Sequence, residues 1–291
     1  MTVGNQRGAR GFSVLELLVV VAVISVLGAI LVPALGKARR QVRSLIGAVN
    51  QKQVVGGVTL FSMDNNDNYP ESVATVGFGP GWNWSDPMKM TGNHTRSPGM
   101  HRSMSAYLRG YIDDAAVMFC PNAPRQYEYL QESWEAGDDW DNPDTSFPAD
   151  PVTGTYCFYW NYTGYLTDKP YPFRGPSGSA DGRGRSTLLV SDYFGYGHWR
   201  SPGCYGSCDR INGASIVQET WLLSAYWSTD GTKNRSELGA KPRAGYTDGH
   251  VSTYTADETI TMRVSMLADG SVPFASGASA GDIYLPADCL R

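Results

Sequence analysis

One segment near the start of the chain constrains the fold more than any other. Residues 11–35 read GFSVLELLVVVAVISVLGAILVPAL, and from residue 12 nearly every position is apolar or small. Glu16 carries the one formal charge in this stretch. At about 1.5 Å rise per residue, a helix of this length spans the roughly 30 Å hydrocarbon core of a bilayer. Lipid offers the backbone no hydrogen-bond partners, so the segment is predicted to be helical.

Two simple interpretations leave part of this segment unexplained. A secretory signal peptide has a shorter apolar core and a small-residue cleavage site after it, whereas KARRQVR follows the long core here. A plain membrane anchor accounts for the length, but a carboxylate within a membrane helix costs roughly 2.5 kcal/mol or more. Glu16 therefore either has a partner charge or lies near the interface and reaches water.

The N-terminal residues resemble those of type IV prepilins and type II secretion pseudopilins. A short basic leader ends in Gly11, Phe12 follows, and Glu16 and Pro33 are the fifth and twenty-second residues counted from Phe12. The resemblance implies that a membrane peptidase cleaves after Gly11 and that Phe12 becomes N-methylated. It also implies that Glu16 pairs with the new α-amino group of Phe12 in a neighbouring subunit. Pro33, which lacks an N–H, is expected to bend or loosen the helix.

The same resemblance implies a domain order and a location. Residues 1–11 would be the leader, 12–63 one long helix, and 64–291 the head, giving an α+β fold with the helix packed on an antiparallel β-sheet. Before assembly the chain would cross a bacterial inner membrane once, with the head in the periplasm or outside the cell. Four basic residues follow the apolar segment, and the positive-inside rule alone would favour the opposite orientation. The implied partners are copies of the chain, other pilin-like subunits, the prepilin peptidase/methyltransferase and an inner-membrane assembly platform.

Residues 36–63 continue the helix with a different surface. Apolar residues recur there at three- and four-residue steps, which predicts an amphipathic helix with one stripe packed against the head. These residues are Val42, Leu45, Ile46, Val49, Val54, Val58 and Phe61. Gly56 and Gly57 each weaken the helix by roughly 1 kcal/mol relative to Ala. The run DNNDNYP at residues 64–70 then predicts a turn. Its acids are an alternative Ca²⁺ site, although they lack the spacing of an EF-hand loop.

The remaining chain has the composition of a β-rich head with long loops. Only 18% of all residues are charged, while Gly (33), Tyr (17) and Trp (8) are abundant. The patterns predict a short helix within 103–113 and an acidic loop within 132–150. Strands are predicted at 117–124, 155–166, 186–193 and 220–227, with a further strand or short helix at 259–267. Residues 243–255 predict a hairpin with a two-residue type I′ turn at Asp248–Gly249. Within the acidic loop, an alternative cation site would use Asp138, Asp139, Asp141 and Asp144.

The hairpin sequence also bears on the family resemblance. TDGHV at residues 247–251 resembles the end of a His-X9-Asp-Gly pattern found in heads that follow prepilin-type N-termini. Leu238 occupies the position of the histidine, so the pattern is only half present.

Five cysteines follow the apolar segment, and an exported head permits disulfides. Cys204 and Cys208 are predicted to close a small loop, and Cys120 and Cys157, both beside predicted strands, form a second candidate pair. Cys289 is then the odd cysteine.

The sequence contains no familiar catalytic motif. His94 and His101 stand in no H-E-x-x-H pattern, and Cys204 and Cys208 lack a second pair of zinc ligands. A net charge of −4 argues against general nucleic-acid binding. We therefore expect a structural subunit without cofactor rather than an enzyme. The alternatives are a membrane-anchored or filament-tip protein whose head recognises a glycan or secreted substrate, and an anchored enzyme with an unfamiliar site.

Overall fold

The structure of the chain, a computed structural model, forms two compact units, residues 1–43 and 44–291. It describes residues 13–78, 82–85, 87–90, 103–121, 129–140, 152, 154–167, 169–179, 184–196, 210–211, 214–215, 241–263, 265–267 and 282–290. The predicted strand at 220–227 lies outside these residues.

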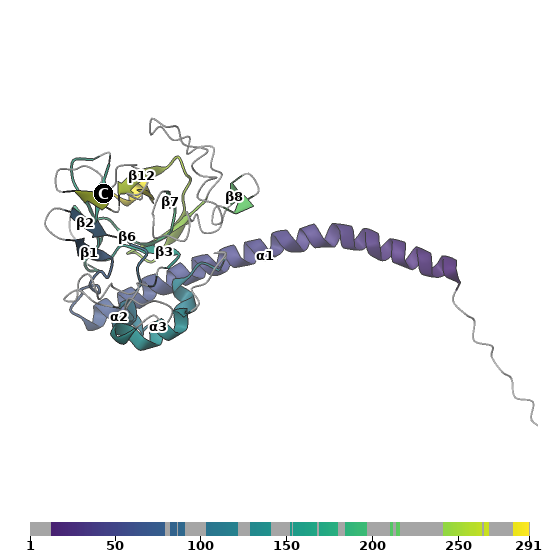
Figure 1. Cartoon of the computed structure of the whole chain (residues 1–291), viewed down its shortest axis with the longest axis horizontal. Helices are drawn as coiled ribbons and strands as arrows, with labels where there is room; N and C mark the ends of the chain where they lie inside the picture. The colour runs from purple at the N-terminus through teal and green to yellow at the C-terminus, as the bar shows by residue number, and fades with distance from the viewer. Residues whose placement is uncertain are drawn as a thin grey trace, which may run out of the picture. The chain divides into compact units, whose positions relative to one another are not determined.

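One helix, α1 (Val14–Asp64), accounts for 51 residues (Figure 1). It matches the predicted helix at 12–63 and continues through Pro33 without a break. Within its apolar part, the Ser25 hydroxyl donates to the Val21 carbonyl at 2.7 Å. That bond satisfies the hydroxyl inside the helix, so Ser25 adds little polarity to the apolar surface.

Antiparallel sheets build the second unit, which confirms the predicted α+β fold. The four-stranded sheet has the order β11 (Val251–Thr253), β10 (Arg243–Tyr246), β6 (Leu188–Asp192), β3 (Tyr156–Phe158). The five-stranded sheet has the order β5 (Phe173–Arg174), β4 (Thr163–Leu166), β12 (Thr259–Arg263), β14 (Asp282–Pro286), β7 (Gly195–Tyr196). A three-stranded sheet contains β1 (Thr75–Phe78), β2 (Trp82–Ser85) and β13 (Ser265–Leu267), and a two-stranded sheet contains β8 (Arg210–Ile211) and β9 (Ala214–Ser215).

Short helices complete the described part of the head. They are α2 (Met104–Leu108), α3 (Leu130–Ala136) and the 3₁₀ helices η2 (Ala115–Met118), η3 (Gly137–Asp139) and η5 (Ala287–Cys289). Of these, α2 confirms the short helix predicted within 103–113. Two other segments differ from the prediction. Residues 115–118 form η2 where a strand was expected to begin, and α3 occupies the start of the predicted acidic loop.

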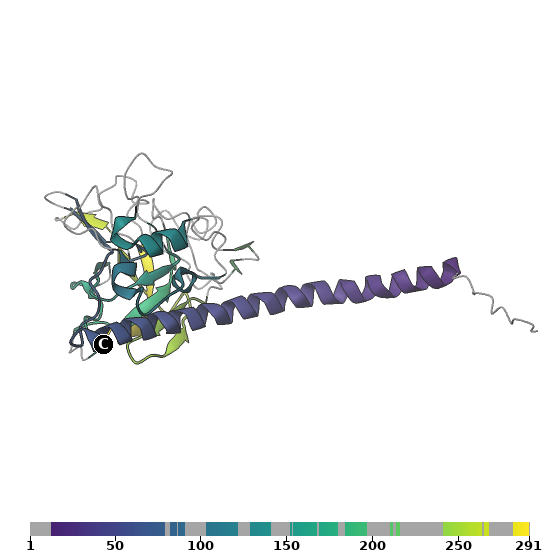
Figure 2. The same ribbon diagram turned by 90° about the horizontal axis from the view of Figure 1, so that it is seen from below.

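The four-stranded sheet has a hydrophobic core on each face. The helix–sheet core brings Val54, Val55 and Val58 of α1 together with β3, β6, α2 and α3. Figures 1 and 2 show the C-terminal part of α1 running beside these elements. The sheet–sheet core, which includes Phe173, Met262 and Ile283, joins the four-stranded sheet to the five-stranded one. All five residues of β6 are buried, which confirms the predicted central strand at 186–193.

The buried face of α1 differs from the predicted stripe. Val42, Leu45, Ile46 and Val49 remain between 44% and 67% exposed. The residues that α1 buries are Gly47, Gln51, Val54, Val55, Gly57, Val58 and Ser62. Small residues select this face because they allow close approach. A Cβ at Gly57 would lie only 2.7 Å from Ile112 Cγ1. The stripe was correct for Val54 and Val58, and Phe61 packs edge-on against Tyr107 and Tyr111.

A buried polar network fixes the same helix face to the sheet. Gln51 Nε2 donates to Asp192 Oδ1 at 2.8 Å, and both residues are fully buried. The backbone N–H of Arg243 donates to Asp192 Oδ2 at 3.0 Å, while the Arg243 guanidinium donates to the Ser44 hydroxyl. A buried carboxylate is tolerated only when it is paired or hydrogen-bonded. Asp192 therefore couples α1, β6 and β10 through directional contacts as well as through packing.

The predicted turn ends α1 and attaches the chain to the head. Asn66 and Asp67 have φ values of 54° and 61°, a left-handed conformation that Asn and Asp tolerate. Tyr69 N–H donates to the Ser177 carbonyl at 2.8 Å. The Asn161 side-chain amide donates to the carbonyls of Tyr69 (3.0 Å) and Pro70 (2.8 Å). These bonds hold the junction from two separate loops.

The hairpin predicted at residues 243–255 exists, and we call it the DGH hairpin after residues 248–250. Its turn is not the predicted type I′ turn. The Tyr246 N–H donates to the His250 carbonyl at 3.0 Å, so the loop has three residues, 247–249. Gly249 N–H donates to the Tyr246 carbonyl at 2.9 Å, and Gly249 has a φ of 86°. A type I′ turn needs positive φ at both central residues, and Asp248 does not have it. The loop is instead a type I turn followed by a left-handed glycine.

The long strand predicted at 155–166 is in fact two strands in different sheets, β3 and β4. Asn161, with a φ of 50°, lies in the turn between them. The strand or helix predicted at 259–267 is confirmed as strand, divided between β12 and β13.

The predicted Cys120–Cys157 disulfide is wrong. Among the cysteines in the described part of the chain, Cys120, Cys157 and Cys289 are buried and form no disulfide. Cys120 packs in the helix–sheet core with Tyr156 and Phe158 of β3, whereas Cys157 belongs to the sheet–sheet core. Successive strand residues point to opposite faces, so β3 directs Cys157 away from Cys120. Burial raises the pKa of the Cys289 thiol to about 12. Cys204 and Cys208 lie outside the described residues.

Adjacent glycines of α1 give a matched test of close packing. Gly57→Val places a side chain against Ile112 and should lower the free energy of unfolding by about 1–3 kcal/mol. At Gly56 an added Cβ meets nothing within 4 Å, so Gly56→Val should change the free energy of unfolding by less than about 0.5 kcal/mol. Urea unfolding of the detergent-solubilised chain, followed by tryptophan fluorescence, measures both. Equal midpoints for the two variants would contradict this packing.

The buried carboxylate offers a second test. Asp192→Ala removes both acceptor oxygens, so the Gln51 amide and the Arg243 N–H lose the partner they have in the buried network. The free energy of unfolding should fall by about 1–3 kcal/mol. Asp257→Asn removes a charge from an exposed residue and serves as the control. If both variants unfold at the same urea concentration, the Asp192 network does not stabilise the fold.

Candidate functional site: the start of the N-terminal helix

The first turn of α1 positions the only acid in the apolar segment. Ser13 N–H and Ser13 Oγ both donate to Glu16 Oε2, at 2.8 and 2.9 Å. In return, Glu16 N–H donates to Ser13 Oγ at 3.2 Å. Ser13 precedes the helix and Glu16 is its third residue, so the pair forms a reciprocal capping box. Gly11 and Phe12, the predicted processing residues, lie outside the described part of the chain.

This capping box matters because of where the helix begins. The first N–H groups of a helix have no partner within it, and an unpaired donor is costly in an apolar environment. Glu16 satisfies the N–H of Ser13, and Ser13 satisfies that of Glu16. The carboxylate is thereby held at the beginning of the helix, close in sequence to Phe12. The S-x-x-E pattern that signals this arrangement is readable in the sequence, although Ser13 was not among the predicted site residues.

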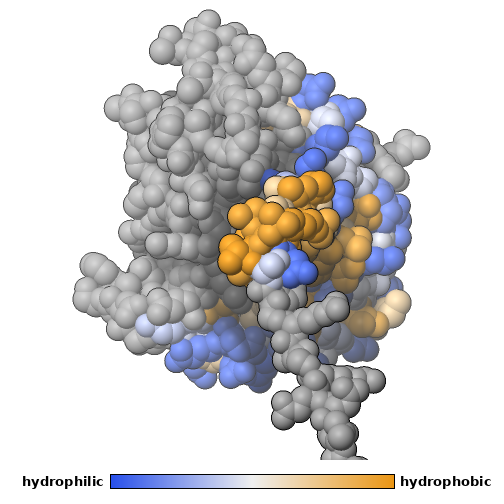
Figure 3. Space-filling view, turned by 90° about the vertical axis from the view of Figure 1, so that its right-hand side faces the viewer, coloured by the Kyte–Doolittle hydropathy of each residue, from blue (hydrophilic) through white to orange (hydrophobic). Residues whose placement is uncertain are grey.

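Beyond Glu16, the helix surface is hydrophobic on all sides. Each large apolar side chain from Val14 to Leu35 is between 45% and 81% exposed. Figure 3 looks toward the N-terminal end of α1 and shows this surface. By length and composition, α1 is sufficient to cross a membrane. Pro33 lies near the end of this apolar stretch.

The acids that were weighed as Ca²⁺ ligands have other contacts. Asp64 accepts from the Tyr111 hydroxyl at 2.7 Å, and Asp67 accepts from the Ser179 hydroxyl at 3.0 Å. Asp138 accepts from the Ser103 N–H at 2.5 Å. Asp141 and Asp144 lie outside the described residues. Within the part of the chain that the structure describes, no three His, Cys, Asp or Glu side chains converge as a metal site would require. A Ca²⁺ site remains an untested prediction.

His250, the histidine of the DGH hairpin, contacts other residues of the same hairpin. Its ring stacks on Tyr246 with centroids 4.3 Å apart, and Nδ1 lies 2.5 Å from Asp248 Oδ1. Asp248 also accepts from the His250 N–H at 3.1 Å, and this bond lowers the pKa of the Asp248 carboxyl. These contacts are local to the hairpin tip. His94 and His101 lie outside the described residues.

The N-terminal segment thus has the features of a type IV prepilin-like protein: a capped acid at the start of a long, outward-facing apolar helix. Residues 6–32 match the family described as the prokaryotic N-terminal methylation motif. The chain is also 32% identical over 73 residues to the type IV wide pilus major component PilA4 of Thermus thermophilus. That match covers 25% of this chain and 56% of the relative, so the chain spans about half the length of the curated protein it matches. No solved structure matches the chain.

Proposed function

We propose that the chain is a structural subunit of a type IV pilin-type filament. It is cleaved after Gly11, N-methylated at Phe12 and assembled through the apolar half of α1. The observation that carries the proposal is the capped Glu16 at the start of a helix whose large apolar side chains are all exposed. The methylation-motif match at residues 6–32 and the pilin relative support it.

The chemistry of the processed end explains why the acid is needed. Cleavage after Gly11 creates an α-amino group at Phe12, and such groups have a pKa of about 7.7–8.0. This cation would meet an apolar environment, where it is tolerated only with a counter-charge. Glu16 of a neighbouring subunit supplies one, and the capping box holds that carboxylate at the corresponding end of its own helix. Pairing of this kind would set the axial stagger between subunits.

The wider setting follows from the same proposal. Before assembly, α1 anchors the chain in the bacterial inner membrane with the head on the periplasmic or outer side. Its partners are the prepilin peptidase/methyltransferase, an inner-membrane assembly platform and other pilin-like subunits. The similarity to a pilus component favours a pilus over a secretion pseudopilus. The second candidate is a non-polymerising or filament-tip subunit, and a pocket on the head, described below, favours it.

The native N-terminus tests the processing step. Mass spectrometry of the protein isolated from its own cells should find a first residue of Phe12 carrying one added methyl group. A Gly11→Lys variant should retain its leader, whereas Gly28→Ala, at an open position further along α1, should be processed normally. A mature protein that still begins at Met1 or Thr2 would refute the proposal.

Two substitutions separate the charge of Glu16 from its capping role. Glu16→Gln removes the charge, but Gln can still cap a helix at this position. Ser13→Ala removes the capping hydroxyl and keeps the carboxylate, at a cost of about 1 kcal/mol in helix stability. If charge pairing drives assembly, Glu16→Gln should be cleaved normally but yield few filaments by electron microscopy. Ser13→Ala should yield filaments at near wild-type levels. The opposite order would show that capping, rather than charge, is what assembly requires.

A further inference from the structure

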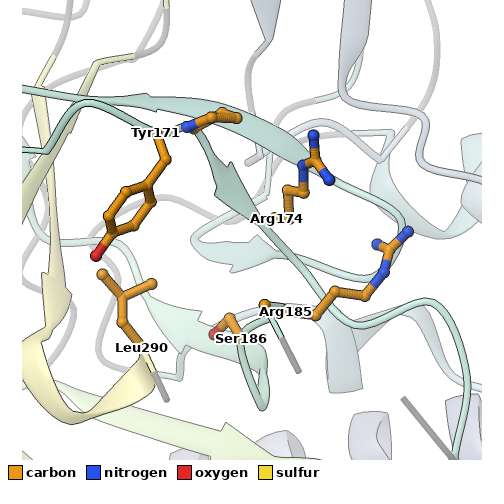
Figure 4. Close-up of a pocket in the computed structure, with 7 residues that line it drawn as sticks. Tyr171, Arg174, Arg185, Ser186 and Leu290 are labelled. Atoms are coloured by element: carbon orange, nitrogen blue, oxygen red, sulfur yellow. The ribbon is translucent and has the colours of Figure 1, made fainter. Parts of the chain in front are cut away.

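A pocket on the head lies beside the edge strand β5. Its volume is about 460 Å³, within the roughly 300–1,000 Å³ range of small-ligand sites. The walls come from three separate segments: the residues around β5, the approach to β6 and the chain after η5 (Figure 4). The side chains that matter here are Tyr171, Pro172, Arg174, Arg185, Ser186 and Leu290.

The pocket has two chemically different sides. Figure 4 shows the Tyr171 ring and Leu290 on one side and the guanidinium groups of Arg174 and Arg185 on the other. None of the described residues that line it is acidic. Tyr171 is 50% exposed, so a large part of its ring is open to a ligand. Two arginines on one side of a pocket are unexpected on a chain of net charge −4, because they raise the local positive potential of an acidic protein.

The backbone fixes one of the two guanidinium groups and joins the segments that carry both arginines. Arg185 Nη1 donates to the Gly175 carbonyl at 2.8 Å, which fixes that guanidinium. The Ser186 N–H donates to the Arg174 carbonyl at 2.7 Å, so the segments that bear the two arginines are bonded to each other. Gly175 is closely packed, since a Cβ there would clash with the backbone of Tyr159. Arg174 itself is exposed, and within the described part of the chain its guanidinium has no hydrogen-bond partner.

We propose that this pocket binds a carboxylate-bearing sugar residue of an acidic polysaccharide. Planar guanidinium groups recognise carboxylates through paired hydrogen bonds. The exposed aromatic ring and Leu290 offer an apolar surface to the C–H face of a sugar ring. The pocket lies at the surface, at the edge of its sheet, so an extended polymer can place a single residue in it. This inference does not rest on filament assembly and applies equally to an anchored subunit.

The test is calorimetric titration of the dispersed full-length chain in detergent micelles. Tetragalacturonate is the probe, and maltotetraose and tetraglutamate are the neutral-sugar and acidic-peptide comparisons. Tetragalacturonate should bind, and both comparison ligands should bind at least about tenfold more weakly. No binding of tetragalacturonate at millimolar concentration overturns the inference. Binding of tetraglutamate with equal affinity overturns the assignment to a sugar.

Variants locate the binding on the chain. Arg174→Gln should weaken tetragalacturonate binding by about tenfold or more, because it removes a charge-assisted contact. Tyr171→Ala should weaken it several-fold without changing the charge. Lys52→Gln removes an exposed positive charge on α1 and should leave the affinity unchanged. All three positions are exposed, so the variants should unfold at the same temperature as the unmodified chain. An equal loss for Lys52→Gln and Arg174→Gln would show that only general electrostatic attraction is at work.

Discussion

The hydrophobic side chains exposed over residues 14–35 must be removed from water, and this requirement dominates the structure. Every large apolar side chain in that part of α1 is exposed, and the transfer of such surface out of water yields about 25 cal/mol per Å². The segment therefore needs a second apolar phase, either lipid or other helices of its kind. An embedded acid restricts the choice, because Glu16 must bring a hydrogen-bond partner or meet a cation. Ser13 provides the hydrogen-bond partner within the chain. In the proposed assembly, the N-terminus of a neighbouring subunit would provide the cation.

The later part of the same helix is instead packed against the head and hydrogen-bonded to it. From Ser44 onward, α1 is held to the sheets of the head by small residues that permit close contact and by the Gln51–Asp192–Arg243 bonds. Its end is then fixed at the left-handed Asn66 and Asp67, where two loops hydrogen-bond to the backbone of the following residues. One unbroken helix thus contains two different parts. Its first part exposes apolar side chains, and its later part is hydrogen-bonded to the head. In the proposed assembly, the apolar part of α1 would exchange lipid for other helices while its contacts within the head remain intact.

The sequence predicted some of these features well, and the failures have physical causes. Length and composition alone identify α1, because few structures accommodate so long an apolar run. Part of the buried face of α1 was missed since glycines and Gln51 do not count as apolar, yet a Cβ at Gly57 would lie only 2.7 Å from Ile112 Cγ1. The Cys120–Cys157 pair failed because strand alternation, which depends on the exact register of β3, separates the two thiols. The hairpin at Asp248–Gly249 was located correctly, but turn type depends on which residues pair at its base. At the start of α1, Glu16 was singled out for its charge, whereas Ser13 was overlooked because a serine beside an apolar helix attracts little notice.

The half-preserved DGH pattern acquires a physical meaning in this structure. Asp248 caps the turn, Gly249 adopts the left-handed conformation, and the His250 ring stacks on Tyr246. The Tyr246 hydroxyl in turn donates to Asp288 at 3.1 Å, in the short helix η5. The next residues are Cys289, which is fully buried, and Leu290, which forms the apolar wall of the pocket beside β5. The hairpin therefore supports the C-terminal residues that complete the pocket. Residues of the half-present His-X9-Asp-Gly pattern thus help to position a surface formed elsewhere in the chain.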